Sequence, residues 1–278
     1  YITEYRPVPL HKMVAVGDAL YDDDLKEIRR IDINDYRLST DDRSVYFAIE
    51  TILEGNGVLL FCSTKGLCEK LARDISSDIF KLGANNRAMS LKTEQTSQKL
   101  KEICITNYEK VVEVLEQLRR TPAGLDKTLE KTIKFRVAFH HAGLTIDERN
   151  IIENSFREGT LKVICATSTL SAGVNLPARR VIVRSPFDFR GSLMDILVYN
   201  QMIGRAGRKG VDTKGESILI CTKDDKYKAL ELIKGDPRPI SSCLVQKSCS
   251  QSQSSQTKTD KPFLITGSLK RAILEIIA

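Results

Sequence analysis

The sequence has no long hydrophobic run. Its longest apolar stretches are short, such as residues 58–62, whereas a helix that crosses a bilayer needs about 18 to 20 apolar residues. The first residues also lack the basic segment followed by an apolar one that marks a secretory signal. We therefore expect no membrane protein and no signal peptide. Because there is no initiator Met and the final helix-like run has no capping Gly or Asn, we expect a piece of a longer protein.

Cysteine pairs and histidines are also scarce. The seven cysteines include no Cys-x-x-Cys pair, so we expect neither disulfides nor zinc, and a reducing compartment. Cys62, Cys165 and Cys221 lie in apolar strand-like runs, where a buried thiol acts as a small hydrophobic group. Of three histidines, His140 and His141 are adjacent at a strand end and should point in opposite directions. We predict no metal site.

Positive charge is concentrated in one part of the chain. The net charge is +7, and residues 161–215 contain nine basic residues but three acidic ones. Such a stretch would attract a phosphate-rich partner, either a nucleotide or a nucleic acid. An ordinary solvated face is the alternative explanation.

Short apolar runs alternate with amphipathic segments from Val58 onward. This order predicts a parallel sheet flanked by helices, an α/β fold. Helices are expected at 66–80 and at 145–157, where Thr145 caps the helix and Glu148 lies three residues further on. The strands are expected at 58–62, 136–139, 162–166, 180–184 and 217–221.

Other segments predict structure without chemistry. Residues 108–120 carry apolar side chains at helical spacing, which predicts a helix laid on the sheet. Residues 85–99 are polar and predict a mobile insertion, whereas 241–261 are rich in Ser, Gln, Thr and Lys and predict a disordered linker. A helix-like run from 269 to 277 predicts the opening of a further domain.

Residues 201–208 form the most specific segment. If this segment is a helix, Arg205 and Arg208 point to roughly the same side, and the flanking glycines allow a close approach to another surface. The planar fork of arginine suits a polyphosphate and can neutralise charge on a transferring phosphoryl group. Two ordinary surface arginines are the alternative.

Four segments in order resemble the conserved motifs of superfamily 2 helicases. The particular residues of these motifs resemble a narrower group, the superkiller-like DNA helicases. Within that group they most closely resemble the family of the helicase-like domain of DNA polymerase theta and of helicase Q. The four segments are 58–65, 139–144, 166–178 and 201–208, which resemble motifs IV, IVa, V and VI.

The resemblance implies a fold and a division of the chain. Residues 1–240 would form the second RecA-like domain, 241–261 a disordered linker, and 262–278 the first helix of a winged-helix domain. The chain has no Gly-x-x-x-x-Gly-Lys-Ser/Thr loop, and Asp147 and Glu148 are interpreted as first-turn helix acids. ATP and Mg²⁺ would therefore be bound mainly by an upstream RecA-like domain, and the isolated chain should be inactive.

The resemblance also implies roles for particular residues. Strand-end hydroxyls can grip phosphates, although they also cap helices, and the 173–175 loop should face the nucleotide. The predicted sets are Arg205, Arg208 and Gln201 for catalysis; Gly173, Asn175 and Gly204 for ATP; and Ser63, Thr64, His141, Thr167 and Thr169 for nucleic acid.

The implied function is the C-terminal motor half of an ATP-dependent DNA helicase of the polymerase theta type. Its partners would be single-stranded or forked DNA and the upstream domain, in nuclear DNA repair. Helicase Q, an RNA helicase of the superkiller type and a noncatalytic nucleic-acid-binding module remain as alternatives.

Overall fold

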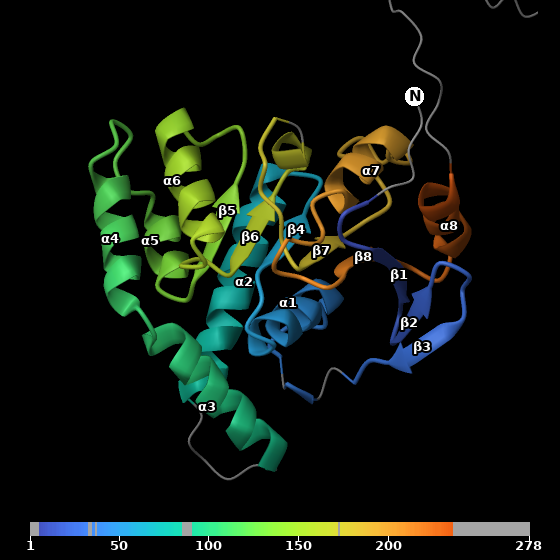
Figure 1. The fold of residues 1–278 in the computed structure, drawn as a ribbon, viewed down its shortest axis with the longest axis horizontal. Helices are drawn as coiled ribbons and strands as arrows, with labels where there is room; N and C mark the ends of the chain where they lie inside the picture. The colour runs from blue at the N-terminus through green and yellow to red at the C-terminus, as the bar shows by residue number, and fades with distance from the viewer. Residues whose placement is uncertain (1–5, 33–34, 37, 85–90, 172, 236–278) are drawn as a thin grey trace, which may run out of the picture. The chain divides into compact units, whose positions relative to one another are not determined.

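The central element is a sheet that runs through the chain. The computed structural model describes residues 6–32, 35–36, 38–84, 91–171 and 173–235, and within these residues all strands belong to one sheet. The strands, shown in Figure 1, are β1 (Leu10–Val16), β2 (Ala19–Asp22), β3 (Glu27–Arg30), β4 (Val58–Phe61), β5 (Val137–His140), β6 (Val163–Ala166), β7 (Arg180–Val183) and β8 (Gly215–Cys221).

The spatial order of the strands is β3-β2-β1-β8-β7-β4-β6-β5. The six strands from β1 to β5 in this order are parallel, which confirms the predicted α/β fold, and β2 and β3 extend the sheet in antiparallel fashion. Phe61 at the end of β4 pairs with both Ala166 and Val183. The carboxyl ends of β4, β6 and β7 therefore meet at one edge of the sheet. The strands β1 to β3 were not expected from the sequence.

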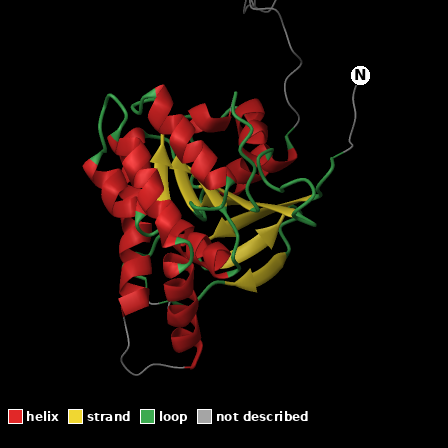
Figure 2. Cartoon of the chain, turned by 60° about the vertical axis from the view of Figure 1, so that its left-hand side comes forward, coloured by secondary structure: helices red, strands yellow, loops and turns green. Residues whose placement is uncertain are grey.

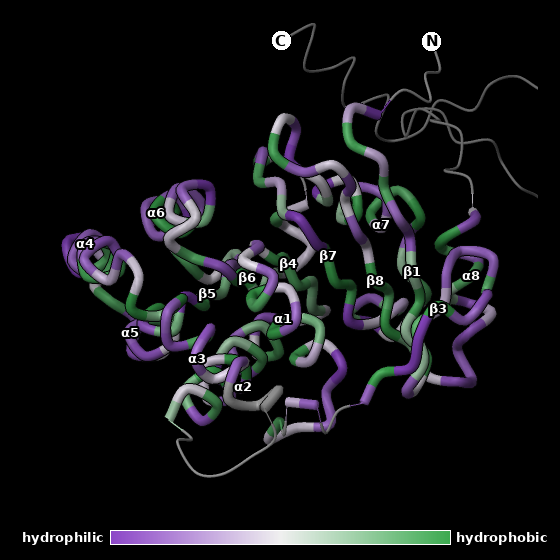
Figure 3. The backbone as a smooth tube through the Cα atoms, turned by 60° about the horizontal axis from the view of Figure 1, so that its bottom comes forward, coloured by the Kyte–Doolittle hydropathy of each residue, from purple (hydrophilic) through white to green (hydrophobic). Residues whose placement is uncertain are grey.

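Burial on both faces explains why the strands are continuous apolar runs. All four residues of β4 and all four of β6 are buried, as expected for parallel strands covered by helices on both sides. Apolar residues are concentrated along β4, β7 and β8 (Figure 3). The helices are α1 (Arg43–Leu53), α2 (Lys65–Ala84), α3 (Leu91–Ile105), α4 (Tyr108–Arg119), α5 (Lys127–Ile133), α6 (Ile146–Arg157), α7 (Ile196–Ile203) and α8 (Lys226–Lys234), with a 3₁₀ turn, η2, at Ser168–Ser171.

The helices lie on both sides of the parallel strands (Figure 2). α1 and α2 lie on one side of the sheet, whereas α6 and α7 lie on the other (Figure 3). The expected cap of α6 is confirmed: the Glu148 N–H donates to Thr145 Oγ1 at 3.3 Å, and Thr145 N–H donates to Glu148 Oε2 at 2.7 Å. No helix in the described ranges is both long and apolar enough to cross a membrane.

Two expectations for helices need correction. α4 forms as predicted, but it packs on α5 and α6 instead of on the sheet. Residues 91–99 belong to helix α3, which packs on α2 and α1, so the predicted mobile insertion is wrong there. The apolar pattern of this helix is weak: among the α3 side chains that the structure describes, only a few, such as Leu100, are buried. Residues 85–90, the linker at 241–261 and the helix within 262–278 lie outside the described residues.

Candidate functional site

The carboxyl edge of the sheet gathers the predicted strand-end hydroxyls. Ser63 and Thr64 follow β4, and Thr167 and Thr169 follow the neighbouring β6. Thr64 and Thr169 are exposed, and the hydroxyls of Thr167 and Thr169 lie 2.9 Å apart. Thr64 Oγ1 also accepts from Leu67 N–H at 3.3 Å, at the start of α2. The capping role and an outward-facing hydroxyl therefore coexist at Thr64.

His141 lies beneath this edge, not on its surface. The ring stacks on Phe139 with centroids 5.1 Å apart, and His141 Nε2 lies 3.2 Å from Glu69 Oε1. Because Gly143 N–H donates to His141 Nδ1 at 3.1 Å, a neutral ring with its proton on Nε2 satisfies both contacts. His141 is buried, so in this structure it supports the loop and does not face solvent.

His140 points to a different carboxylate. Its Nε2 lies 2.8 Å from Glu153 Oε1 in the interior, and burial lowers the pKa of His140 despite that carboxylate. The two adjacent histidines therefore diverge, as expected for neighbours at a strand end. Within the described part of the chain, no group of three or more His, Cys, Asp or Glu residues has the arrangement of a metal site.

The loop that leaves β7 at the same carboxyl edge exposes an aromatic ring that was not anticipated. Phe189 is 67% exposed, and the Arg190 guanidinium lies 5.0 Å from the centre of its ring. Asp188 holds the loop by accepting from the N–H groups of Arg190 and Ser192. Exposed aromatic rings and guanidinium planes can stack on nucleobases.

The amino edge of the sheet carries the arginine segment. α7 ends at Ile203, and the chain then runs beside Ala178, which donates to Arg205 O at 2.9 Å and accepts from Gly207 N–H at 2.7 Å. Gly207 has φ of +91°, and a Cβ there would lie 2.7 Å from Val8. The expectation that Arg205 and Arg208 share one helix is therefore wrong, because α7 ends before either arginine and Gly207 adopts a non-helical conformation between them.

The two arginines face different partners. Arg205 donates to the Ser171 carbonyl, and its Nε is buried without a hydrogen-bond partner in the described residues. Arg208 instead binds Asp212, and this hydrogen-bonded pairing raises the pKa of Arg208. Burial without a carboxylate lowers the pKa of Arg205. The structure thus separates two residues that the sequence placed together.

A cavity of about 530 Å³ lies at this amino edge. It brings together three of the predicted residues, Asn175, Gly204 and Arg208. The other three residues that were predicted for catalysis or ATP binding, Gly173, Gln201 and Arg205, do not line the cavity. Gly173 and Gln201 are exposed.

The cavity is positively charged. Arg157, Lys162 and Lys209 line it with Arg208, and Glu158 is the acidic residue among its lining residues. Burial, followed by repulsion from Arg136 and Arg208, lowers the pKa of Lys162. The positive charge around Lys162 is therefore incompletely neutralised, which suits an anionic group.

The chain that follows α7 and carries the two arginines, residues 204–208, is called the arginine turn below. An N-terminal segment to which the sequence analysis gave no role also supports it. Arg6 donates through Nη2 to Ala206 O at 2.7 Å and to Gly204 O at 3.5 Å. These carbonyls follow the end of α7, where a cation is favourable. No local pattern signals this contact, because Arg6 and Ala206 are far apart in the sequence.

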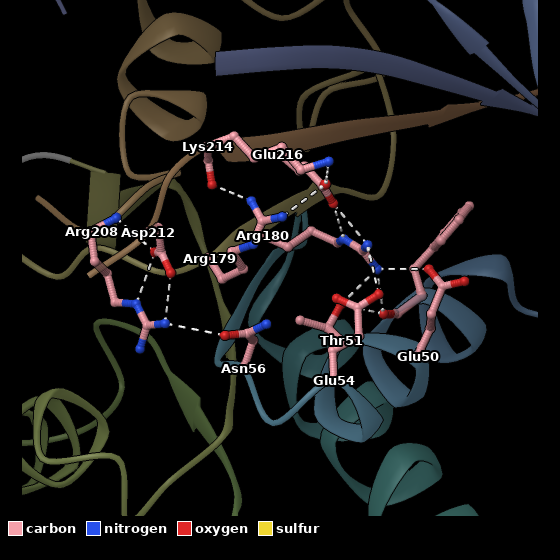
Figure 4. A network of polar contacts seen from close by, with 11 residues as sticks. Glu50, Thr51, Glu54, Asn56, Arg179, Arg180, Arg208, Asp212, Lys214 and Glu216 are labelled. Atoms are coloured by element: carbon pink, nitrogen blue, oxygen red, sulfur yellow. Dashed lines mark hydrogen bonds and ion pairs between the residues drawn. The ribbon is translucent and has the colours of Figure 1, made fainter. Parts of the chain in front are cut away.

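A buried ion network underlies the same edge (Figure 4). Arg180 at the start of β7 binds Glu216 at 2.8 Å and Glu50 at 2.8 Å, and Arg179 and Lys214 also bind Glu216, each at 3.1 Å. Burial would raise the pKa of Glu216, but the charge of Arg180 and hydrogen bonds from Arg180 and Lys214 outweigh it and lower the pKa to about 2.

This network changes the interpretation of the basic stretch. Of its nine basic residues, five form ion pairs with carboxylates, namely Arg179, Arg180, Arg184, Arg208 and Lys214. Apart from Arg208, which also lines the cavity, these paired side chains do not form a free surface for a phosphate-rich partner.

Comparisons with known proteins agree with this architecture. A model described as the helicase conserved C-terminal domain matches residues 93–210, and one described as a helix-turn-helix domain matches residues 215–278. The chain belongs to the superfamily 2 helicases.

Within that class, the chain is homologous to the helicase-like region of DNA polymerase theta. It is 43% identical to DNA polymerase theta of Mus musculus over 277 residues, which cover 100% of this chain and 10% of the relative. It is 36% identical to Helicase POLQ-like of Homo sapiens (87% and 21% covered) and 34% identical to ATP-dependent DNA helicase Hel308 of Methanocella arvoryzae (87% and 30% covered). The chain therefore spans between 10% and 30% of the length of these relatives.

Proposed function

We propose that the chain is the C-terminal motor half of an ATP-dependent DNA helicase of the polymerase theta type. One observation carries the proposal: a single segment, 167–178, links the two candidate sites. It begins with the hydroxyls of Thr167 and Thr169 at the carboxyl edge and ends at Ala178, which is hydrogen-bonded to the arginine turn. We propose that a displacement at either site is transmitted to the other along this segment of the chain.

The cavity at the amino edge would form one wall of the ATP site. Arg208 would contact the transferring phosphoryl group, with Asn175 and Gly204 beside it. The positively charged lining fits a triphosphate. It does not fit Mg²⁺, because Glu158 is the acidic residue among its lining residues, so the metal ligands and most of the ATP contacts would come from an upstream RecA-like domain. Gln201 and Arg205 would assist only after a rearrangement.

The carboxyl edge would bind one strand of single-stranded or forked DNA. Ser63, Thr64, Thr167 and Thr169 offer hydroxyls to backbone phosphates, and such contacts position nucleic acid without reading its sequence. His141 would act indirectly by holding the loop, and Phe189 would stack on a base. A noncatalytic nucleic-acid-binding module would not need a partly exposed arginine in a positively charged cavity. The position of Arg208 therefore favours a helicase motor domain over such a module.

We propose the biological setting from the resemblance to a family of relatives. We propose a role in DNA repair in the nucleus, because the match to DNA polymerase theta covers 100% of this chain.

The isolated chain provides the first test. It should release no phosphate from ATP, because the Lys and the carboxylates that cradle phosphate and Mg²⁺ are absent from its sequence. It should bind single-stranded DNA weakly, with little sequence preference, and less tightly as salt rises. Phosphate-release and fluorescence-anisotropy assays measure both. DNA-stimulated ATP hydrolysis by the isolated chain, or binding that does not depend on salt, would contradict the proposal.

A further inference from the structure

The guanidinium of Arg208 is held from one side by a carboxylate four residues further along the chain. Arg208 Nε donates to Asp212 Oδ2 at 2.9 Å, and Arg208 Nη2 donates to Asp212 Oδ1 at 2.8 Å. The backbone N–H of Arg208 also donates to Asp212 Oδ2 at 2.8 Å. From the turn before β4, Asn56 Oδ1 accepts from Arg208 Nη2 at 3.2 Å (Figure 4).

These contacts leave a defined part of the arginine free. A guanidinium has five N–H donors, and the Asp212 and Asn56 contacts use three of them, one on Nε and two on Nη2. Among the described residues, no hydrogen bond involves Nη1 of Arg208, so both of its donors remain. The Arg208 side chain is 33% exposed and lines the cationic cavity.

We propose that Asp212, with Asn56, is a positioning residue that fixes Arg208 so that its Nη1 end faces the phosphoryl group of ATP. This inference rests on the proposed function, because it assumes that the cavity faces the nucleotide. Arg205 has no such support: its guanidinium binds a carbonyl and forms no ion pair in the described residues. The structure therefore distinguishes Arg208, whose guanidinium is held by a carboxylate, from Arg205, whose guanidinium is not.

Two features make Asp212 suited to this role. Its carboxylate is only 5% exposed. Burial would raise its pKa, but hydrogen bonds from the Arg208 side chain and backbone lower it below the ordinary range, so the group stays charged at neutral pH. In addition, Asp212 N–H donates to Arg208 O at 2.9 Å, which closes the 208–212 turn. A long, flexible side chain is thus ordered before the nucleotide arrives, which lowers the entropic cost of aligning it.

The test uses steady-state ATPase kinetics of the complete helicase. Asp212→Asn should lower kcat by about 10-fold to 100-fold, the cost of a misplaced catalytic group, while the KM for ATP changes far less. Asp212→Glu, which keeps the charge, should retain more turnover than Asp212→Asn. Asp147→Asn, which removes an exposed acid from the first turn of α6, is the matched control and should leave kcat unchanged.

A double-mutant cycle separates positioning from a merely structural role. If Asp212 acts through Arg208, adding Asp212→Asn to Arg208→Ala should cause no further loss of turnover. A further loss in the double variant, full turnover in Asp212→Asn, or a gain in turnover that reveals a restraining contact would each overturn the inference. If Asp212→Asn does not fold, as judged by thermal unfolding, Asn56→Ala decides: unchanged kcat would also overturn it.

Failure of this inference can be told apart from failure of the proposed function. Full turnover in Arg208→Ala would remove Arg208 from the site and with it the proposed wall of the ATP site. Loss of turnover in Arg208→Ala combined with full turnover in Asp212→Asn would overturn only the role of Asp212.

Discussion

The two edges of the sheet differ in the kind of polar group that they present. At the carboxyl edge, exposed hydroxyls such as Thr64 and Thr169 predominate beside one half-buried ion pair, Arg184 with Asp42. At the amino edge, charged groups are held in pairs: Arg208 with Asp212, and Arg180 with Glu216. A hydroxyl can move its hydrogen bond from one backbone phosphate to the next at little cost in free energy. A guanidinium that is fixed by a carboxylate is instead suited to a phosphate at one position. This difference supports the proposal that the carboxyl edge holds a moving nucleic-acid strand and the amino edge holds the nucleotide.

The largest effect should come from the amino edge, at Arg208. Arg208→Ala should lower ATP turnover of the complete helicase by about 10³-fold or more, since charge develops on the phosphoryl oxygens in the transition state. Arg208→Lys should fail nearly as badly, because a point charge cannot reproduce the bidentate contact with Asp212. Nucleotide affinity, measured by titration, should change much less than kcat.

Arg119→Ala on α4, which removes an exposed arginine paired with Glu130, is the control for Arg208 and should keep full turnover. Wild-type turnover in Arg208→Ala would erase the contrast between the two edges.

The ion network beneath the amino edge should matter for stability. Glu216→Gln should lower the free energy of unfolding by about 3 kcal/mol, because it leaves Arg180 buried with weakened charge compensation. Chemical denaturation measures this change. Glu27→Gln, which breaks an exposed pair with Arg30, should cost less than about 1 kcal/mol, and an equal cost for the two variants would contradict the account.

The same carboxylate predicts a pH dependence. The folded-state pKa of Glu216, about 2, lies below the ordinary 4.5, so its stabilisation is complete above pH 4.5 and is lost as the pH falls toward 2. Glu216→Gln should therefore lose less stability than the wild type over this acid range. Parallel curves for the two proteins would exclude Glu216 as the titrating group.

The smallest effect should come from the carboxyl edge. Replacing Thr64 and Thr169 together by alanine should lower single-stranded DNA affinity roughly tenfold, since each hydroxyl contributes about 1 kcal/mol or less. The salt dependence should not change, because a hydroxyl displaces no counterion. Thr106→Ala, at an exposed threonine after α3, is the control, and equal affinities for all three proteins would argue against this edge as the DNA site.

The parallel strands could be predicted from the sequence because burial on both faces makes them continuous apolar runs. The strand-end hydroxyls could be predicted to lie together for the same reason, since parallel strands end at one edge. Helix α3 was missed because few of its described side chains are buried. The prediction that Arg205 and Arg208 share a helix was wrong because α7 ends at Ile203 and Gly207 adopts φ of +91° between the two arginines. The weak apolar pattern of α3 gives no clear local signal, whereas the glycines at 204, 207 and 210 are a local signal against a continuous helix.

The charged site could be predicted only in part. The spacing of Arg208 and Asp212, four residues apart, is visible in the sequence, but the partners of the other arginines are distant. Arg180 meets Glu50 across 130 positions, and Arg184 meets Asp42 across 142. A count of charges along the chain therefore overestimates the free positive surface, because pairing depends on the order of the strands in the sheet.

One crossed measurement on the complete helicase tests the central claim that the two edges have separate tasks. Arg208→Ala should lower ATP turnover by about 10³-fold or more, while single-stranded DNA affinity without nucleotide stays unchanged. The Thr64→Ala, Thr169→Ala double variant should lose DNA affinity while ATP turnover at saturating DNA is largely kept. If Arg208→Ala weakens nucleotide-free DNA binding as much as the threonine variant does, the two edges are not separate sites and the account is wrong.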